Sequence, residues 1–167
     1  MVTIREAKPG DYLALTRLSE DVVSENSWLT PEPGDTRFTC GYWSSGSERG
    51  DLILVALVGD AVVGFLRLQH GGDGNAHTLA MLVDKAHRGR GIGKALVTEV
   101  VTRLERQPRS AIVLSVYAHN EAAIALYSKS GFRKVAFFRS HCKRRNGEIW
   151  SAWTMRRDIH GSTSRSR

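Results

Sequence analysis

The length and composition of the chain fit a single folded domain. With 167 residues, a chain buries roughly 70% of the surface that its unfolded form exposes, so one core is expected without crosslinks or metals. Hydrophobic residues make up 41% and charged residues 25%, and no stretch approaches the ~20 consecutive apolar residues needed to cross a bilayer. The start has no secretory signal pattern and the two cysteines form no spaced framework. Together these features predict a soluble, cytoplasmic protein.

The formal net charge of +7 favours an anionic partner, and the distribution of the basic residues narrows the choice. Basic residues cluster at 85–94, at 133–145 and after Met155. The first cluster contains no aromatic residues, so it does not form a stacking platform for nucleic acid. We therefore expect no nucleic-acid and no membrane partner. Residues 161–167 have nothing apolar to bury, so we predict a single domain of residues 1–160 with a disordered tail.

Hydrophobic periodicity and turn residues predict an alternation of strands and helices. In chain order we expect a strand at 2–6, a helix after Pro9, an irregular segment at 26–50 with one short helix at 36–42, a hairpin of 52–58 with 61–69, and a strand at 76–83. A helix follows Gly93 and stops at Pro108, and then come a strand at 111–118, a helix at 120–130 that Asn120 caps, and an antiparallel pair of 132–139 with 149–156. This order predicts an α+β domain with a mixed sheet.

A glycine-rich basic turn joins the strand at 76–83 to the following helix. Gly89, Gly91 and Gly93 would let main-chain amides approach a ligand, and the helix that starts near Ile92 adds unpaired N–H groups and a partial positive charge. These features suit a pyrophosphate. The spacing matches neither the nucleotide P-loop, because Lys94 precedes an alanine, nor a complete dinucleotide fingerprint. The alternative is a solvated basic turn whose glycines only connect the two elements.

A second motif lies one helix and one strand downstream. The helix reads Asn-Glu-Ala-Ala-Ile-Ala-Leu-Tyr-Ser-Lys-Ser-Gly-Phe from residue 120 to 132, and the turn reads Arg-Gly-Arg-Gly-Ile-Gly from residue 88 to 93. The pair resembles the GNAT acetyltransferase family, in which an Arg/Gln-x-x-Gly-x-Gly/Ala loop precedes an Asn-x-x-Ala-x-x-Leu-Tyr-x-x-x-Gly-Phe helix. The resemblance is specific over residues 78–133.

The resemblance implies a GNAT fold and acetyl-CoA as the acetyl donor. The fold would be a mixed, mostly antiparallel seven-stranded sheet with splayed central strands, flanked by about four helices. Members of the family are frequently dimers, so a homodimer is an open alternative. The cofactor contacts that it implies are Leu82 and Val83 along the pantetheine arm, Arg88, Gly89, Arg90, Gly91, Ile92, Gly93 and Lys94 on the pyrophosphate, Asn120, Ala123 and Tyr127 beside the arm, and Lys129 on the adenosine phosphate.

The chemistry of acetyl transfer assigns roles to a few of these groups. An amine attacks the thioester carbonyl directly, with both substrates bound, and coenzyme A leaves as a thiolate. A main-chain N–H near Leu82 would stabilise the oxygen that becomes negative. The resemblance makes Tyr127 the general acid that protonates the thiolate, and its alternative is a tyrosine that packs the helix against the sheet.

The base that accepts the proton of the amine is less clear. The family often has a glutamate on the strand before the loop, but residues 78–83 contain no acid. Asp84, Glu32 and Asp35 are alternatives, and His119 is our candidate because histidine titrates nearest neutrality. An ordinary surface or capping histidine is the competing interpretation.

We expect the acceptor pocket between residues 26–43 and the hairpin that ends the chain. Trp28, Glu32, Trp43 and Trp150 are the candidate acceptor-binding residues, and core packing is the alternative for the tryptophans. Arg139, Arg144 and Arg145 could meet a carboxylate or form a solvated basic face. The histidines and cysteines lack the spacing of a zinc site, so we expect no metal.

The sequence thus predicts an acetyl-CoA-dependent N-acetyltransferase acting on a primary amine of a small molecule, such as an amino acid, polyamine or amine antibiotic. Acetylation of a protein or peptide is the alternative within the same class. A non-catalytic coenzyme A sensor and a nucleic-acid binder are alternatives from other classes.

Overall fold

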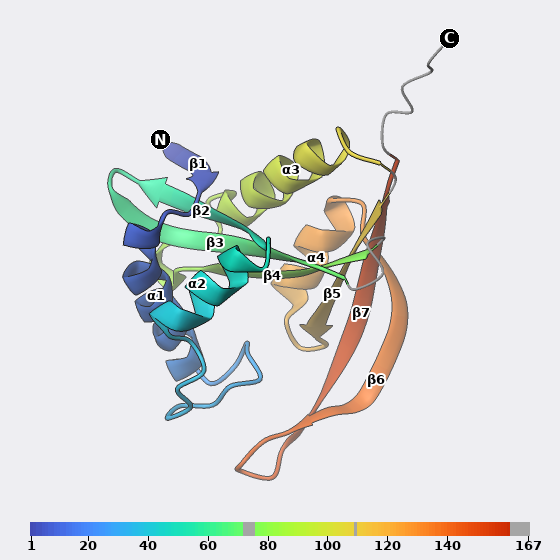
Figure 1. Cartoon of the computed structure of the whole chain (residues 1–167). Coiled ribbons are helices and arrows are strands. Elements are labelled where there is room, and N and C mark those ends of the chain that lie inside the picture. Colours follow the sequence, from blue (N-terminus) through green and yellow to red (C-terminus); the bar gives the residue numbers. More distant parts are fainter. Residues whose placement is uncertain (72–75, 109, 161–167) are drawn as a thin grey trace.

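The computed structural model describes residues 1–71, 76–108 and 110–160 (Figure 1). Its strands are β1 (Val2–Glu6), β2 (Leu52–Val58), β3 (Ala61–His70), β4 (Ala76–Val83), β5 (Ser110–Tyr117), β6 (Arg133–Lys143) and β7 (Ile149–Ile159). Its α-helices are α1 (Tyr12–Ser24), α2 (Cys40–Glu48), α3 (Ile92–Leu104) and α4 (Glu121–Lys129). The predicted disordered tail at 161–167 lies outside the described residues. None of the helices in the described part of the chain reaches the length and apolarity of a membrane-spanning helix.

The strands form one seven-stranded sheet in the order β1-β2-β3-β4-β5-β7-β6. Every neighbouring pair is antiparallel except β4 with β5, which is parallel and is joined by the crossover through α3. The predicted mixed, mostly antiparallel sheet with four helices is therefore confirmed.

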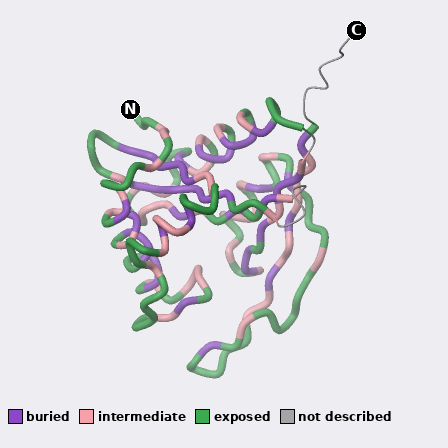
Figure 2. The backbone as a smooth tube through the Cα atoms, in the orientation of Figure 1, coloured by how far each residue is buried: buried purple, intermediate pink, exposed green. Residues whose placement is uncertain are grey.

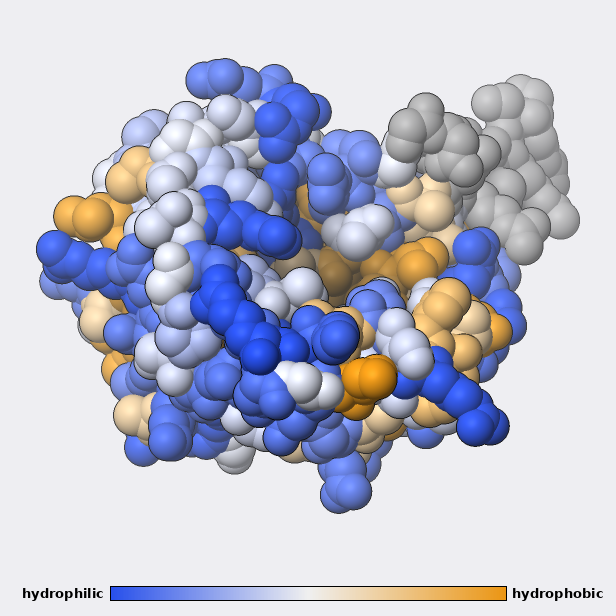
Figure 3. All heavy atoms as spheres, turned by 90° about the horizontal axis from the view of Figure 1, so that it is seen from below, coloured by the Kyte–Doolittle hydropathy of each residue, from blue (hydrophilic) through white to orange (hydrophobic). Residues whose placement is uncertain are grey.

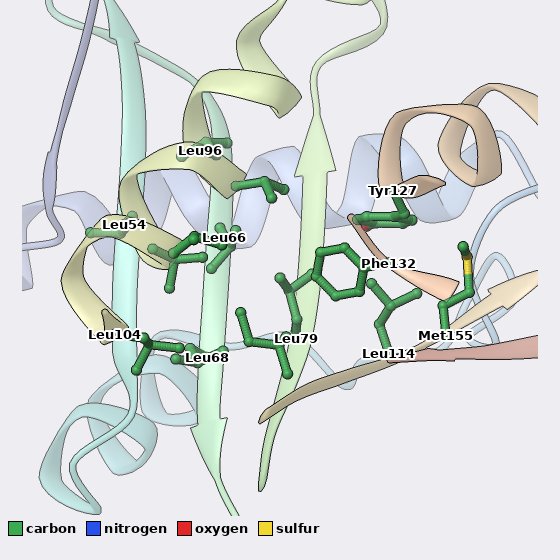
Figure 4. Packing of buried hydrophobic residues seen from close by; sticks show 14 of the residues in the cluster. Leu54, Leu66, Leu68, Leu79, Leu96, Leu104, Leu114, Tyr127, Phe132 and Met155 are labelled. Atoms are coloured by element: carbon green, nitrogen blue, oxygen red, sulfur yellow. The ribbon is translucent and has the colours of Figure 1, made fainter. Parts of the chain in front are cut away.

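Side chains alternate between the two faces of the sheet and build a separate core on each. Leu54, Leu66 and Leu79 pack against α3 and α4, together with Tyr127 and Phe132 (Figure 4). The neighbouring residues of the same strands point the other way and pack against α1 and Trp43 of α2, through Ile53, Val55, Phe65 and Leu82. The period of two along each strand fixes this division.

The two central strands separate after a short paired stretch. β4 pairs with β5 only from Ala76 to Thr78, opposite Ala111 to Val113, although both strands continue well beyond these residues. In Figure 1, β4 continues across the view beside β3, whereas β5 turns downward away from it. The predicted splay is confirmed, and it leaves main-chain groups in the middle of the sheet without a neighbouring strand.

Two boundaries differ from the sequence prediction for local reasons. The short helix expected at 36–42 instead occupies Cys40–Glu48, because Thr39 is its N-cap and accepts the N–H of Tyr42 at 3.1 Å. The last two strands are longer than predicted and reach Lys143 and Ile159. The hairpin that they form carries exposed residues along nearly all of β6 (Figure 2).

Candidate active site

The glycine-rich turn has the backbone conformation of an anion-binding loop. Gly91 is the N-cap of α3 and adopts a left-handed conformation with φ 79°, and Gly89 has φ 74°. A side chain at either position would be strained, and nothing lies within 4 Å of where it would point. The amides at the start of α3 have no partner within the helix. The turn therefore presents free N–H groups and open space to a ligand.

Arg88 anchors this turn to the N-terminal half of the chain. Its guanidinium donates to both carboxylate oxygens of Glu25, at 2.8 and 2.6 Å, and its Nε donates to the carbonyl of Val83 at 3.0 Å. Glu25 also accepts the indole N–H of Trp28 at 2.8 Å. The hydrogen bond from Arg88 is the main cause that lowers the pKa of Glu25. The side chain of Arg88 is thus committed to protein partners, and the main-chain N–H groups of the turn remain available to a ligand.

A cavity of about 570 Å³ runs from this turn to the opposite face of the sheet. Gly91 and Leu126 line it on the α3–α4 side, whereas Phe38 and Tyr42 line it on the α1–α2 side. The cavity therefore passes through the gap between β4 and β5. Viewed from below, the surface is hollowed and hydrophobic residues show at the floor of the hollow (Figure 3).

The hydrogen-bonding pattern of β4 decides which main-chain groups face the gap. Asp84 donates to the carbonyl of Val63, and Gly71 donates to the carbonyl of Ala76. In an antiparallel ladder such pairs alternate, so the main chain of Leu82 is bonded to β3 and that of Met81 and Val83 faces the gap. This corrects the expected main-chain contact from Leu82, whose side chain still lines the cavity. The two N–H groups that face the gap on either side of Leu82 belong to Met81 and Val83, and the carbonyl of Val83 already accepts from Arg88.

Tyr127 lies on α4 with its ring among the buried side chains of the core (Figure 4). It is 6% exposed, its ring centroid is 5.5 Å from that of Phe132, and it also lines the cavity. Burial raises the pKa of Tyr127 well above its ordinary value, so the hydroxyl stays protonated at neutral pH. Among the described residues the hydroxyl has no hydrogen-bond partner. It is therefore a neutral donor available to a ligand in the cavity.

The other predicted cofactor residues divide between two hollows. Ile92, Gly93, Lys94, Asn120 and Ala123 line the cavity, and Asn120 caps α4 by accepting the N–H of Ala123 at 3.2 Å. Lys129 lies instead in a second hollow, which it shares with Lys94 and Arg157. Arg90 is exposed and lines neither hollow.

The structure brings two of the four predicted acceptor residues to the cavity. Trp28 and Trp43 line it, although Trp43 is 1% exposed and belongs mainly to the core. Glu32 and Trp150 do not line it. The carboxylate of Glu32 accepts the N–H of Arg145 at 2.9 Å, and Trp150 lies 4.0 Å below the guanidinium carbon of Arg144. These two side chains hold the walls of the pocket together.

Arg144 fastens the tip of the last hairpin to the loop that follows α1. It is 3% exposed and donates to the carbonyls of Leu29 and Thr30 at 2.9 Å and to the amide oxygen of Asn26. Neither of the sequence interpretations for Arg144, a carboxylate ligand or a solvated face, describes this role. The contact holds the tip of the hairpin against Leu29 and Thr30, two residues that line the cavity.

His119 lies beside the acceptor end without lining it. Its Nε2 donates to the carbonyl of Ser27 at 2.7 Å, and its ring stacks on Tyr117, whose centroid is 5.6 Å away. Of the alternative acids, Asp84 bonds His87 at 2.5 Å and Asp35 pairs with Arg145. The sequence analysis missed several polar residues of the lining, among them Arg67, Tyr117 and His141. Only Arg67 carried a signal, as an arginine inside an apolar strand.

Comparisons with known proteins agree with this geometry. The family model described as "Acetyltransferase (GNAT) family" matches residues 16–132. The chain is 28% identical to the L-amino acid N-acetyltransferase AaaT of Escherichia coli over 163 residues, which cover 93% of this chain and 97% of that protein. It is 38% identical to the N-alpha-acetyltransferase RimI of Mycobacterium tuberculosis over 82 residues, which cover 49% of this chain and about half, 47%, of that protein.

Solved structures share the fold. A putative acetyltransferase from Salmonella typhimurium, determined with its cofactor acetyl-CoA, has a TM-score of 0.83 at 19% identity and covers 99% of this chain and 98% of its own. The turn, the splayed strands and the buried tyrosine thus occur in a fold that holds acetyl-CoA, and the residues present here fit that cofactor. The chain belongs to the GNAT family of acetyltransferases, and it is an acyltransferase that uses acetyl-CoA as its acetyl donor.

Proposed function

We propose that the enzyme transfers the acetyl group to a primary amine of a small molecule. The observation that carries this proposal is the contact of Arg144, which fastens the hairpin to Leu29 and Thr30 of the cavity wall. A pocket bordered by a fixed hairpin and loop admits a compact acceptor more easily than a folded protein surface. The similarity to AaaT along nearly the whole chain supports an amino acid as that acceptor.

The residues of the cavity support direct attack with both substrates bound. The amine nitrogen forms a bond to the acyl carbon while the carbon–sulfur bond breaks and its electron pair leaves with the sulfur. The N–H of Met81 stabilises the carbonyl oxygen, a contribution of roughly 3 kcal/mol for one well-placed donor. The amides of residues 88–94 hold the pyrophosphate.

Tyr127 acts on the departing sulfur. A phenol is a weaker acid than a thiol, whose reference pKa is about 8.5, so full proton transfer in water would be uphill. Burial raises the pKa of Tyr127 further, but it also raises the proton affinity of a thiolate held in the same apolar site. Tyr127 therefore begins as a hydrogen-bond donor to the sulfur and delivers its proton as the negative charge develops there.

His119 serves as the base through Nδ1, because Nε2 is bonded to Ser27. Its ring lies outside the cavity lining, so a water molecule carries the proton from the amine to the ring. His141, which lines the cavity, is the competing residue.

A second candidate acceptor is the α-amine of a protein, because the chain also resembles RimI over about half its length.

We further propose a homodimer, since Phe137 and Phe138 are exposed on β6, the edge strand of the sheet. The cytoplasm stays the proposed compartment, since Cys40 and Cys142 are both unpaired.

A free-thiol release assay with acetyl-CoA tests the function across a panel of amino acids, polyamines, aminoglycosides and short peptides. We expect turnover with at least one small amine and weaker turnover with peptides. Turnover with peptides alone would favour the second candidate. Sedimentation would give twice the chain mass of 18.5 kDa for the proposed dimer.

A further inference from the structure

Arg67 is a buried arginine whose side chain lines the acceptor end of the cavity. It lies on β3, is 6% exposed, and stands opposite Ala80 of β4 in the sheet register. Ala80 also lines the cavity and lies two residues, roughly 6.8 Å, from Leu82 beside the reaction centre. The guanidinium is thus built into the wall that faces an acceptor.

Neighbouring groups fix the guanidinium on every side but one. Nε and Nη2 donate to the same oxygen of Asp51 at 2.9 and 2.5 Å, and the ring of Tyr42 lies 4.5 Å from the guanidinium carbon. Gly46 of α2 leaves room for Nη2, because a Cβ at that position would come within 3.1 Å of it. The orientation of the side chain is therefore set before any ligand arrives.

The remaining nitrogen, Nη1, has no acceptor among the described residues. Arg67 is 6% exposed and lines the cavity, so the N–H groups of Nη1 are the part of the guanidinium that remains for a ligand there. A pair made only to hold β3 against the segment that precedes β2 is already complete with Asp51. The free edge of the guanidinium indicates a ligand that supplies acceptor oxygens from the cavity.

We propose that Arg67 binds a carboxylate of the acceptor, so the substrate is an amine that also carries a carboxylate. Trp28, Phe38 and Tyr42 line the same end of the cavity and give it apolar walls. These walls suit an acceptor with an apolar body between its two polar groups or beside them. This assignment rests on the proposed small-molecule function and specifies the class of molecule.

Matched pairs of acceptors test the assignment in the full-length enzyme. In each pair, one acceptor carries a carboxylate and the other is a similar amine without it. L-methionine is compared with 3-(methylthio)propylamine to test an α-amino acid, and 5-aminopentanoate is compared with pentylamine to test an ω-amino acid. We expect kcat/KM to favour one carboxylate-bearing member by about 10- to 100-fold, the range that one charge-assisted hydrogen bond supports. The preferred pair shows where the carboxylate stands relative to the amine.

Variants of the buried ion pair between Arg67 and Asp51 test whether Arg67 causes the preference for the carboxylate-bearing acceptor. Arg67→Met combined with Asp51→Asn removes both charges together and should reduce the preference to about one. Asp51→Asn alone keeps the cation and removes the competing anion, so the preference should rise. Arg67→Lys keeps the charge without the planar fork and should give an intermediate preference. Arg103→Met, which removes a cation on α3 paired with Glu99 and Glu6, is the control and should keep the wild-type preference.

Calorimetry with the coenzyme A-bound protein gives a readout that does not depend on turnover. The carboxylate-bearing acceptor should release heat with the wild type and not with the double variant. Equal kcat/KM for both members of each pair in the wild type would overturn the assignment and leave the proposed function standing. So would a preference that survives in the double variant. Absence of turnover with every small amine would overturn both.

Discussion

The carboxylate of Glu25 and the guanidinium of Arg88 are joined by two hydrogen bonds of 2.6 and 2.8 Å across 63 residues of sequence. The pair connects the end of α1 to the start of the glycine-rich turn. Since Trp28 bonds the same carboxylate, the side chain of Glu25 joins this turn to a residue that lines the cavity.

Glu25→Gln should loosen this connection. We expect KM for acetyl-CoA to rise roughly 10-fold and the free energy of unfolding to fall by about 1 kcal/mol, a modest figure because the side chain of Arg88 is 34% exposed. The pKa of Glu25 lies below its ordinary value of 4.5, so its contribution is complete above that pH and is lost as the pH falls through the lower value. Denaturant titrations from pH 7 downward should show the two proteins converging in acid. A constant difference would contradict the assignment.

Tyr127→Phe removes only the hydroxyl from the buried ring. We expect kcat to fall roughly 100-fold, the lower range for a group that assists proton transfer, with affinity for acetyl-CoA retained. Stopped-flow turnover and calorimetry separate these two quantities. Tyr12→Phe, which makes the same change in the core around α1, is the control and should keep wild-type kcat. An unchanged kcat in Tyr127→Phe would leave the residue with a packing role alone.

The same tyrosine should affect stability in alkali. Its pKa in the folded protein lies above the ordinary value of 10.0, so above pH 10 the unfolded chain loses a proton that the folded chain keeps. The free energy of unfolding should therefore decrease as the pH rises from 10, and Tyr127→Phe should reduce that slope. Urea titrations between pH 9 and pH 11 measure it. Parallel slopes for the two proteins would show that the phenol is not shielded from water.

Arg144 and Arg145 are neighbours in sequence, but we expect their replacement to cost very different amounts of stability. Arg144→Met leaves the carbonyls of Leu29 and Thr30 without a donor, so we expect a loss of about 3 kcal/mol in stability and a higher KM for the acceptor. Arg145→Met removes a side chain that is 61% exposed and should cost less than about 1 kcal/mol. Thermal unfolding and acceptor titrations of the two variants make the comparison. Equal losses would mean that the buried contact does not hold the pocket.

Gly91→Ala tests the conformation of the turn. A side chain in the left-handed region costs roughly 1 kcal/mol, and we expect the strain to displace the amides and raise KM for acetyl-CoA. Gly10→Ala, also in open space but without positive φ, is the control. If both variants bind acetyl-CoA like the wild type, the turn does not depend on this glycine.

Local patterns made the cofactor side of the site readable from sequence. The glycines of the turn and the cap at Asn120 act within a few residues of themselves, and the structure places them as expected. Trp28 lines the cavity, and its role as an acceptor-binding residue stays a prediction. The hydrogen bond by which Thr39 caps α2 is equally local. The preference for threonine at a helix N-cap could therefore have predicted where α2 starts.

The acceptor side depends on contacts that sequence spacing does not reveal. Arg144 donates to the carbonyl of Leu29 across 115 residues. Glu32 and Trp150, which the sequence analysis expected to bind substrate, instead contact Arg145 and Arg144 at the same place. Arg67 is a cation in an apolar strand, but its orientation toward the cavity follows from Asp51 and Tyr42 together. Such arrangements are set by the tertiary fold.

The divergence of β4 from β5 means that the folded chain contains two strand edges in the interior of its own sheet. Leu79, Met81 and Val83 on one side, and Ser115 and Tyr117 on the other, direct main-chain groups into the space between them. We expect an extended ligand with amide groups, such as a pantetheine arm, to take the place of a neighbouring strand there. Hydrogen exchange at these amides should slow when acetyl-CoA binds, so the cofactor completes the architecture as well as donating its acetyl group.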